Sequence, residues 1–261
     1  MVRLATFNVN SIRARLPAVM AWLGREDLDV VLFQEIKVRD EEFPVGAFED
    51  AGWQIVYHGQ PSYNGVAIAS RLSLEDVHMG LDGLGDDKQA RYIEALVGGR
   101  LRVGCLYAPN GNPVSDTMKY SYKLSWMRRL LEHASARLRD EPDLPMVLGG
   151  DYNVCPSDED VYNPASFADD ALCRPETRAH YRSFAHMGFT DALRVRYPVE
   201  TVYTFWDYKH GAWPKNHGLR IDHLLLNPAA ADLLLDAGVD CSLRGEPKAS
   251  DHTPVWVSLD V

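Results

Sequence analysis

The sequence predicts an α/β protein in which two β-sheets pack face to face and helices cover their outer faces. Short apolar runs rich in Val, Ile, Leu and Phe recur along the chain between polar or turn residues, as is typical of buried strands. Amphipathic segments lie between some of these runs and predict helices. Other runs follow one another without a helix between them, which favours antiparallel pairing within the sheets.

The first third of the chain predicts four strands and one helix. The run at 4–7 predicts a strand, and residues 14–26 follow it with helical spacing of their apolar side chains, namely Leu16, Val19, Met20 and Leu23. Further strands are predicted at 29–33, 53–59 and 65–70.

The rest of the chain continues the same alternation. Strands are predicted at 91–96, 100–107, 145–150, 221–226 and 255–259. Residues 118–139 predict a long amphipathic helix, and 175–188 predict another that closes on Gly188.

Length and composition indicate one catalytic domain over residues 1–261. The chain is 46% hydrophobic and 25% charged, has no repeat or linker-like segment, and no apolar stretch long enough to span a bilayer. We therefore expect no membrane partner and, by default, a monomer. The start of the sequence lacks a secretory signal, so a cytoplasmic location is expected. The four cysteines show no paired spacing and are expected to be reduced packing residues: Cys105, Cys155, Cys173 and Cys241.

The net charge of -10 argues against a globally basic surface that coats nucleic acid. Phosphate contacts would have to come from local basic pairs, which are otherwise ordinary solvated surface. The candidates are Arg13 and Arg15, Lys37 and Arg39, Lys88 and Arg91, Lys119 and Lys123, and the stretch 209–220.

Polar residues stand at the ends of six strand-like runs, where side chains distant in sequence can converge at one edge of a sheet. They are Asn8, Glu35, Asp151, Asn153, Asp222 and the run 250–254, Ser-Asp-His-Thr-Pro. With Asn10 and Asp251, these residues offer hard oxygen ligands, which suit Mg²⁺. Zinc is disfavoured because the set lacks several His or Cys ligands. The residues predict a metal-dependent hydrolytic site.

His252 is the candidate general base of this site, because an imidazole titrates near neutral pH. It needs a carboxylate to orient it. Adjacent residues of an extended strand point to opposite faces, so Asp251 is assigned to the metal and Asp222 to His252.

Six blocks of sequence resemble, in order and over nearly the whole chain, bacterial exonuclease III and the related abasic-site endonucleases. The blocks are TFNVNSIRAR, LFQEIK, LYAPNG, GGDYNV, GLRIDHLLL and SDHTPVW. The resemblance implies a four-layer αββα sandwich and Mg²⁺-dependent hydrolysis of phosphodiester bonds, with Mn²⁺ as a possible substitute. It also implies a double-stranded DNA substrate, cut 5′ to abasic sites or trimmed and cleaned at its 3′ ends.

Roles for individual residues follow from the matching blocks. Glu35 resembles the principal metal ligand, helped by Asn8, Asn10 and Asp251. Asp151 and Asn153 resemble the pair that positions the attacking water and the phosphate, and Asp222 with His252 resembles the orienting dyad. Tyr107 resembles a tyrosine that contacts the phosphate or the leaving oxygen, with Asn110 beside it. Whether Asp151 or His252 accepts the proton of the water stays open.

A pocket for an extruded abasic sugar is expected from residues 203–222, because flipping a nucleotide without a base costs little and a small apolar pocket rejects normal nucleotides. Its expected lining is Phe205, Trp206, Leu219 and Ile221, with Lys209, Lys215 and Arg220 near phosphates. Two segments depart from the family: no arginine follows the LYAPNG block, and residues 157–178 differ most and carry no assigned role.

Two other functions remain open. A different member of the wider superfamily could use the same metal site on RNA, inositol phosphates or sphingolipids, although lipid-directed and deoxyribonuclease I-like relatives usually carry a histidine where this chain has Tyr107. A noncatalytic binding module is the second alternative. It has no need for the Asp222 and His252 pair.

Overall fold

The first sheet contains both ends of the described chain. In the computed structural model, which describes residues 1–82 and 87–261, its strand order is β11-β12-β1-β2-β4-β3. The strands are β1 (Val2–Asn8), β2 (Val30–Gln34), β3 (Gln54–His58), β4 (Val66–Ser70), β11 (Leu234–Val239) and β12 (Val255–Leu259). Only β1 and β2 pair in parallel, and β12 lies between β1 and β11.

The second sheet has the order β5-β6-β7-β8-β10-β9. Its strands are β5 (Leu74–Met79), β6 (Tyr92–Val97), β7 (Leu101–Tyr107), β8 (Met146–Asp151), β9 (Thr190–Asp191) and β10 (Asp222–Leu226). β7 and β8 pair in parallel, and the other neighbours are antiparallel. Both sheets are therefore mixed and mainly antiparallel, as predicted.

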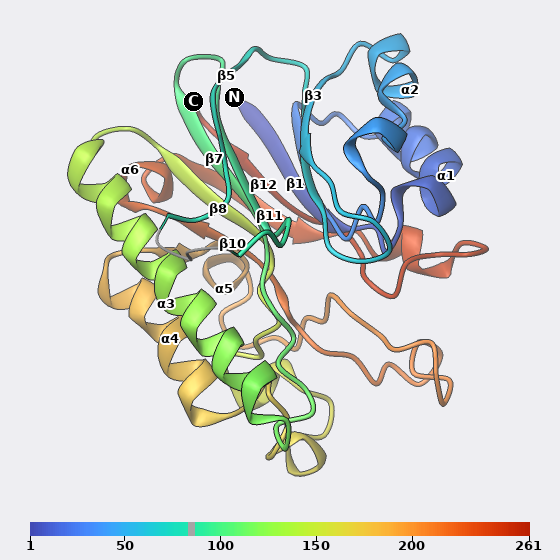
Figure 1. The fold of residues 1–261 in the computed structure, drawn as a ribbon, viewed down its shortest axis with the longest axis vertical. Coiled ribbons are helices and arrows are strands. Elements are labelled where there is room, and N and C mark those ends of the chain that lie inside the picture. The colour runs from blue at the N-terminus through green and yellow to red at the C-terminus, as the bar shows by residue number, and fades with distance from the viewer. Residues whose placement is uncertain (83–86) are drawn as a thin grey trace.

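The two sheets face each other and helices cover their outer sides (Figure 1). α1 (Ile12–Arg25) and α2 (Val45–Asp50) pack on the first sheet, and α3 (Thr117–Asp140) and α4 (Pro175–His186) pack on the second. The short helices are α5 (Ala192–Arg196) and α6 (Pro228–Ala231). Alternation along β1 explains the layers: Leu4 joins the core between the sheets, whereas Phe7 packs outward among residues of α1. The predicted αββα arrangement is confirmed.

Local sequence signals explain where the main helices begin and end. The Ser11 side chain accepts a hydrogen bond from the backbone N–H of Ala14 and caps α1, and Asp116 caps α3 through Lys119 N. α4 begins with Pro175 at its first position. It ends two residues before Gly188, whose φ of 98° is the left-handed conformation that closes the helix.

Every predicted strand and helix is present, with ends shifted by a few residues. Strands β5, β9 and β11 were not predicted. β5 is an edge strand with mostly exposed residues and β9 has only two residues, so neither produces an apolar run. Among the helices of residues 1–82 and 87–261, none combines the length and apolar character that crossing a membrane requires.

Candidate active site

Strand register in the second sheet brings three predicted residues into one row. Tyr107 at the end of β7 pairs with Asp151 at the end of β8, and Asp151 pairs with Asp222 at the start of β10. Residues paired across neighbouring strands lie about 5 Å apart. The register therefore sets a phenol and two carboxylates side by side at one edge of the sheet.

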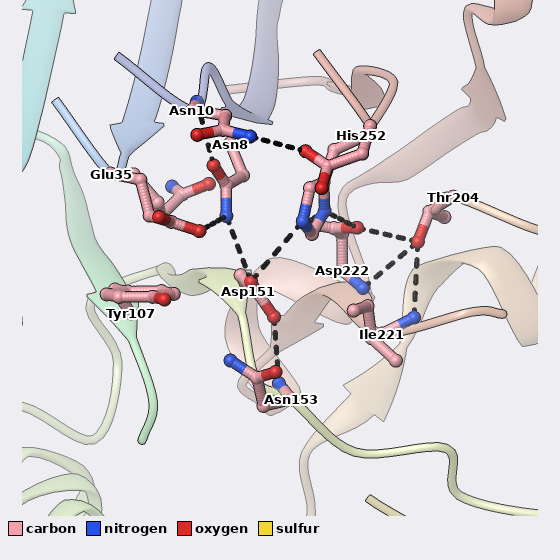
Figure 2. A network of polar contacts seen from close by, with 12 residues as sticks. Asn8, Asn10, Glu35, Tyr107, Asp151, Asn153, Thr204, Ile221, Asp222 and His252 are labelled. Atoms are coloured by element: carbon pink, nitrogen blue, oxygen red, sulfur yellow. Dashed lines mark hydrogen bonds and ion pairs between the residues drawn. The ribbon is translucent and has the colours of Figure 1, made fainter. Parts of the chain in front are cut away.

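The first sheet supplies the opposite half of the site. Asn8 ends β1, Glu35 follows β2, and His252 precedes β12. The Asn8 side-chain amide donates to Glu35 Oε1 at 2.9 Å and to Asp151 Oδ2 at 3.0 Å (Figure 2). One buried amide thus links a carboxylate from each sheet.

Glu35 is held by charge and by a constrained backbone. Lys37 Nζ lies 2.6 Å from Glu35 Oε2 and also donates to Asn10 Oδ1 at 2.6 Å. Burial by itself raises the pKa of Glu35, but Lys37 and Asn8 outweigh it and the pKa falls below its ordinary value. Glu35 also has a φ of 52°, which is uncommon for a residue with a side chain and is one of the strained conformations that cluster at functional sites.

His252 is oriented by Asp222 from the other sheet. Its Nδ1 lies 2.8 Å from Asp222 Oδ2, and Thr204 Oγ1 donates to the same oxygen at 2.6 Å (Figure 2). Burial lowers the pKa of His252, but the Asp222 and Asp151 carboxylates outweigh it and raise the pKa to about 10. This arrangement turns Nε2 toward Asp151 Oδ2, 3.7 Å away.

Carboxylate oxygens of Glu35 and Asp151 and a ring nitrogen of His252 all lie within 4.8 Å of one another. Burial, together with the nearby Asp222 and Glu35, raises the pKa of Asp151 to about 7. Crowded carboxylates of this kind carry negative charge that a divalent cation can neutralise, and oxygen ligands suit Mg²⁺. The donor set therefore fits a magnesium ion.

Asp251 and Asn10 lie next to this cluster. Asn10 Nδ2 donates to Asp251 Oδ1 at 3.0 Å, and Asn10 N donates to Asn8 Oδ1 at 3.0 Å. Asp251 therefore faces the Asn10 side of the site, whereas His252 faces Asp222. Asn8 is oriented by the same hydrogen bonds, which keep its amide on the two carboxylates.

The loops after β7 and β8 are tied together below the carboxylates. Asn110 Nδ2 donates to Asn153 Oδ1 at 2.9 Å, and Asn153 N donates to Asp151 Oδ1 at 2.9 Å. The buried Lys123 of α3 donates to the backbone carbonyls of Asn153, at 2.6 Å, and of Asn110, at 3.1 Å. Burial lowers the pKa of this ammonium to about 7, against the opposing effect of Asp151.

Tyr107 lies across from the histidine, beside Glu35 (Figure 2). Its ring lies under the Arg91 guanidinium, 5.0 Å from the ring centroid. Burial and the Glu35 and Asp151 carboxylates raise the pKa of its phenol well above the ordinary value. Tyr107 therefore remains protonated and can donate a hydrogen bond to an anionic ligand.

A cavity of about 430 Å³ opens beside these groups. Of the predicted residues, its lining includes Glu35, Tyr107, Asn110, Asp151, Asn153, Phe205, Lys209, Leu219, Ile221, Asp251 and His252. Phe205 packs edge-on against His252, with ring centroids 4.9 Å apart. An apolar side of the cavity therefore lies directly next to the predicted catalytic groups.

Two residues expected at the pocket, Trp206 and Arg220, lie elsewhere in the structure. Trp206 is 2% exposed, donates through Nε1 to Asn216 and packs against Trp213, so it does not line the cavity. The preceding residue, Phe205, lines the cavity instead, because successive residues of an extended segment point to opposite sides.

The prediction that Arg220 lies near phosphates is also wrong. It is 1% exposed and forms a buried ion-pair cluster with Asp160 and Asp191, both at 2.6 Å, so it cannot contact phosphates. Lys123, a candidate surface cation, is likewise internal. Lys215 is exposed, and its Nζ donates to His210 O at 2.9 Å; it does not line the cavity.

Several residues of the site were not predicted. Thr204 accepts from the backbone N–H groups of Ile221 and Asp222, at 3.1 and 3.2 Å, while its hydroxyl donates to Asp222. No spacing signal in the sequence distinguishes it from other threonines. The segment 157–178, which had no assigned role, also contributes to the cavity lining through Tyr162, Phe167, Asp170 and Leu172.

Comparison with known proteins identifies the family of this chain. The model of the Endonuclease/Exonuclease/phosphatase family matches residues 5–252. The chain belongs to this family. Exodeoxyribonuclease III of Haemophilus influenzae, to which the chain is similar, is 31% identical over 99% of this chain and 100% of its own length.

Solved structures of similar proteins share the whole fold of this family member. An AP endonuclease from Archaeoglobus fulgidus superposes with a TM-score of 0.95 at 37% identity, covering 100% of both chains. The 3′ phosphatase NExo from Neisseria, solved with a product DNA hairpin, gives a TM-score of 0.96 at 38% identity, again over 100% of both chains. The sandwich and both of its sheets are therefore those of the family.

Proposed function

We propose that this protein is a Mg²⁺-dependent DNA repair phosphodiesterase that incises duplex DNA 5′ to abasic sites and trims or cleans 3′ ends. The observation that carries the proposal is the convergence of Glu35, Asp151 and His252 within 4.8 Å, at the mouth of a cavity with an apolar wall. The names of the similar proteins, an exodeoxyribonuclease, an AP endonuclease and a 3′ phosphatase, support DNA as the substrate.

In the proposed reaction, water attacks the phosphorus and the bond to the 3′ oxygen breaks. Glu35, with Asn8, Asn10 and Asp251 around it, would hold Mg²⁺, and Mn²⁺ can replace it. When bound, the ion would offset the negative charge that grows on the phosphate and on the leaving oxygen. Asp222 holds His252 with Nε2 toward Asp151. This placement supports His252 and Asp151 as the two residues that handle the proton of the water.

Amide and phenol donors complete the proposed site. Asn153 is bonded to Asn110 and to Asp151, so its amide can position the phosphate relative to the base. Tyr107 keeps its proton, which supports a hydrogen bond to a phosphate oxygen or to the departing oxygen. The abasic sugar would lie against Phe205, Leu219 and Ile221, with Lys209 near the phosphates.

The proposal also includes the cellular location of the enzyme, its domain organisation and its oligomeric state. Four free thiols, Cys105, Cys155, Cys173 and Cys241, fit a reducing compartment and support a cytoplasmic location. We further propose that residues 1–261 act as one catalytic domain and as a monomer.

A cleavage assay tests the proposal. The protein is incubated with an end-labelled duplex that carries one abasic analogue, or with an undamaged duplex that has a recessed 3′ end, in Mg²⁺ or in excess EDTA. Incision immediately 5′ to the lesion that requires Mg²⁺ is expected. If the folded protein with metal cuts neither DNA, the repair function is wrong, and RNA and phosphorylated lipids become the substrates to test.

Asp151→Asn sharpens this test. Removal of the carboxylate should lower kcat by at least about 100-fold, the usual range for loss of acid-base catalysis, while duplex binding is retained. Asp143→Asn, an exposed carboxylate on the loop before β8, is the matched control and should keep full activity. Undiminished turnover in Asp151→Asn would contradict the assigned site.

A further inference from the structure

The cavity is larger than the extruded sugar requires. At about 430 Å³ it falls among pockets that enclose whole small-molecule ligands, roughly 300–1,000 Å³. Phe205, Leu219 and Ile221 offer an apolar surface beside His252 that a sugar can occupy. The cavity continues beyond them, along the segment 157–178 that the sequence left without a role.

The far part of the cavity is aromatic. Tyr162 stacks on His217, with ring centroids 4.5 Å apart and planes only 7° from parallel. Phe167 meets Tyr162 edge-on, with centroids 5.7 Å apart. Tyr162 remains 38% exposed and His217 is exposed, so the rings present free surface. We call Tyr162, Phe167 and His217 the aromatic wall.

A series of backbone bridges connects the aromatic wall to the catalytic histidine. His252 pairs with Phe205, Phe205 pairs with Leu219, and Leu219 pairs with Val161, next to Tyr162. Each bridge spans about 4.8 Å, the usual spacing of neighbouring strands. The aromatic wall and the catalytic groups line the same cavity. A sugar bound against Phe205 alone would leave the aromatic wall unused.

The segment that carries Tyr162 and Phe167 is anchored on both sides. Asp160, two residues before Tyr162, is fully buried and paired with Arg220 and with Arg194. At the other end of the segment, Asp170 accepts from Asn112 Nδ2 at 3.0 Å. A surface that is preorganised in this way loses little conformational entropy when it binds a ligand.

We propose that the aromatic wall stacks the base of the nucleotide that is being removed from a 3′ end, so that the site takes base-bearing as well as base-free residues. The inference rests on the proposed phosphodiesterase activity and specifies its substrate. Every nucleobase has a flat aromatic face, so stacking accepts all four bases without reading sequence. The chemical step is unchanged: the oxygen of water bonds to phosphorus, the preceding 3′ oxygen leaves with a proton, and a 5′-mononucleotide is released.

The test compares two 3′ ends on the same recessed duplex, with the protein of residues 1–261 and Mg²⁺. One end carries an ordinary nucleotide and the other carries a 3′-phosphate, whose removal places no base in the cavity. The measured quantity is the ratio of kcat/KM for nucleotide removal to kcat/KM for phosphate removal. Tyr162→Ala should lower this ratio about tenfold, near the lower end of the contribution of stacking one base.

Tyr162→Phe is the matched control, because it keeps the ring and should keep the wild-type ratio. A ratio that stays constant in Tyr162→Ala overturns the inference, whether both activities fall together or neither changes. A wild-type protein that removes the phosphate but no nucleotide also overturns it, while leaving the phosphodiesterase function intact. If wild type processes neither end nor an abasic duplex, the proposed function itself fails.

Discussion

His223 follows the proposed dyad residue Asp222 in β10, yet its side chain lies on the other face of the sheet. Its Nε2 lies 2.9 Å from the carbonyl oxygen of Val154, and Arg220 Nη1 lies 3.1 Å from its Nδ1. A neutral ring with its proton on Nε2 satisfies both contacts. Burial and the Arg220 charge lower the pKa of His223 to about 4. The protein therefore folds around an uncharged histidine.

This histidine should make stability depend on pH. As pH falls from 6.5 toward 4, the unfolded chain binds a proton that the folded protein does not, so acid reduces the free energy of unfolding. The shift corresponds to a loss of about 3 kcal/mol. Urea unfolding of wild type and His223→Gln at pH 7.5 and pH 4.5 measures it, and the variant should lose less stability than wild type over this interval.

His186→Gln is the control, because His186 is an exposed histidine at the end of α4. It should show the wild-type dependence of stability on pH. Equal acid sensitivity of wild type and His223→Gln would show that His223 titrates alike in the folded and unfolded states.

Among the elements, α3 does more than cover the second sheet. Its Lys123 reaches beneath the loops that follow β7 and β8 and binds the carbonyls of Asn110 and Asn153. Gly111 makes room for it, since a Cβ there would stand 2.6 Å from the Lys123 side chain. The helix thereby fixes the two asparagines that face the proposed phosphate position.

Lys123→Met tests this positioning role. Methionine fills the space but cannot donate, so the buried carbonyl of Asn153 and the part-buried carbonyl of Asn110 lose a partner, at a cost of about 1–3 kcal/mol in stability. If the asparagines shift, kcat should fall about tenfold or more with little change in KM, because misplacement affects the reacting geometry. Steady-state kinetics on the abasic duplex measures both constants.

Arg128→Met provides the comparison on the same helix, since Arg128 is exposed. It should match wild type in stability and kinetics. A Lys123→Met protein that is less stable but has an unchanged kcat would assign Lys123 to folding alone.

The elements also show how far sequence alone can go. Apolar periodicity predicts where strands end, and polar residues at those ends, such as Glu35 and Asp151, stand out against the run before them. Periodicity carries no information about partners far away in the chain. Arg220 has the same local context whether it faces solvent or Asp160, which lies 60 residues earlier. The burial of Arg220, the packing of Trp206 and the aromatic wall depend on such distant partners and could not be predicted.

At the scale of the whole molecule, the candidate site lies where the two sheets meet. Asn8, Glu35 and His252 lie at or next to the ends of β1, β2 and β12, which are inner strands of the first sheet, and Asp151 and Asp222 belong to the second sheet. A cation held by Glu35, Asn8, Asn10 and Asp251 would join segments that are distant in the chain, namely those that follow β1 and β2 and the one that precedes β12. Metal binding should therefore be coupled to global stability, because the unfolded chain has no such cluster.

Mg²⁺ should raise the melting temperature of the protein in the absence of DNA. At a concentration 100 times Kd the gain in stability is about 2.7 kcal/mol, or about 5 °C for a chain of this size. Thermal unfolding in Mg²⁺ and in EDTA measures the shift. Glu35→Gln should lose most of it, whereas Glu246→Gln, an exposed glutamate, should keep it. A full shift in Glu35→Gln would place the metal elsewhere.

The position of β12 between β1 and β11 has a consequence for biosynthesis. β1 leaves the ribosome before its neighbour β12 and the adjoining His252, which emerge more than two hundred residues later. At ordinary rates of translation that delay is on the order of tens of seconds. During this interval the nascent chain carries Glu35 and Asp151 without the histidine that faces them. On the proposed mechanism, in which His252 helps to handle the proton of the water, a growing polypeptide would not cleave nucleic acid before His252 has left the ribosome.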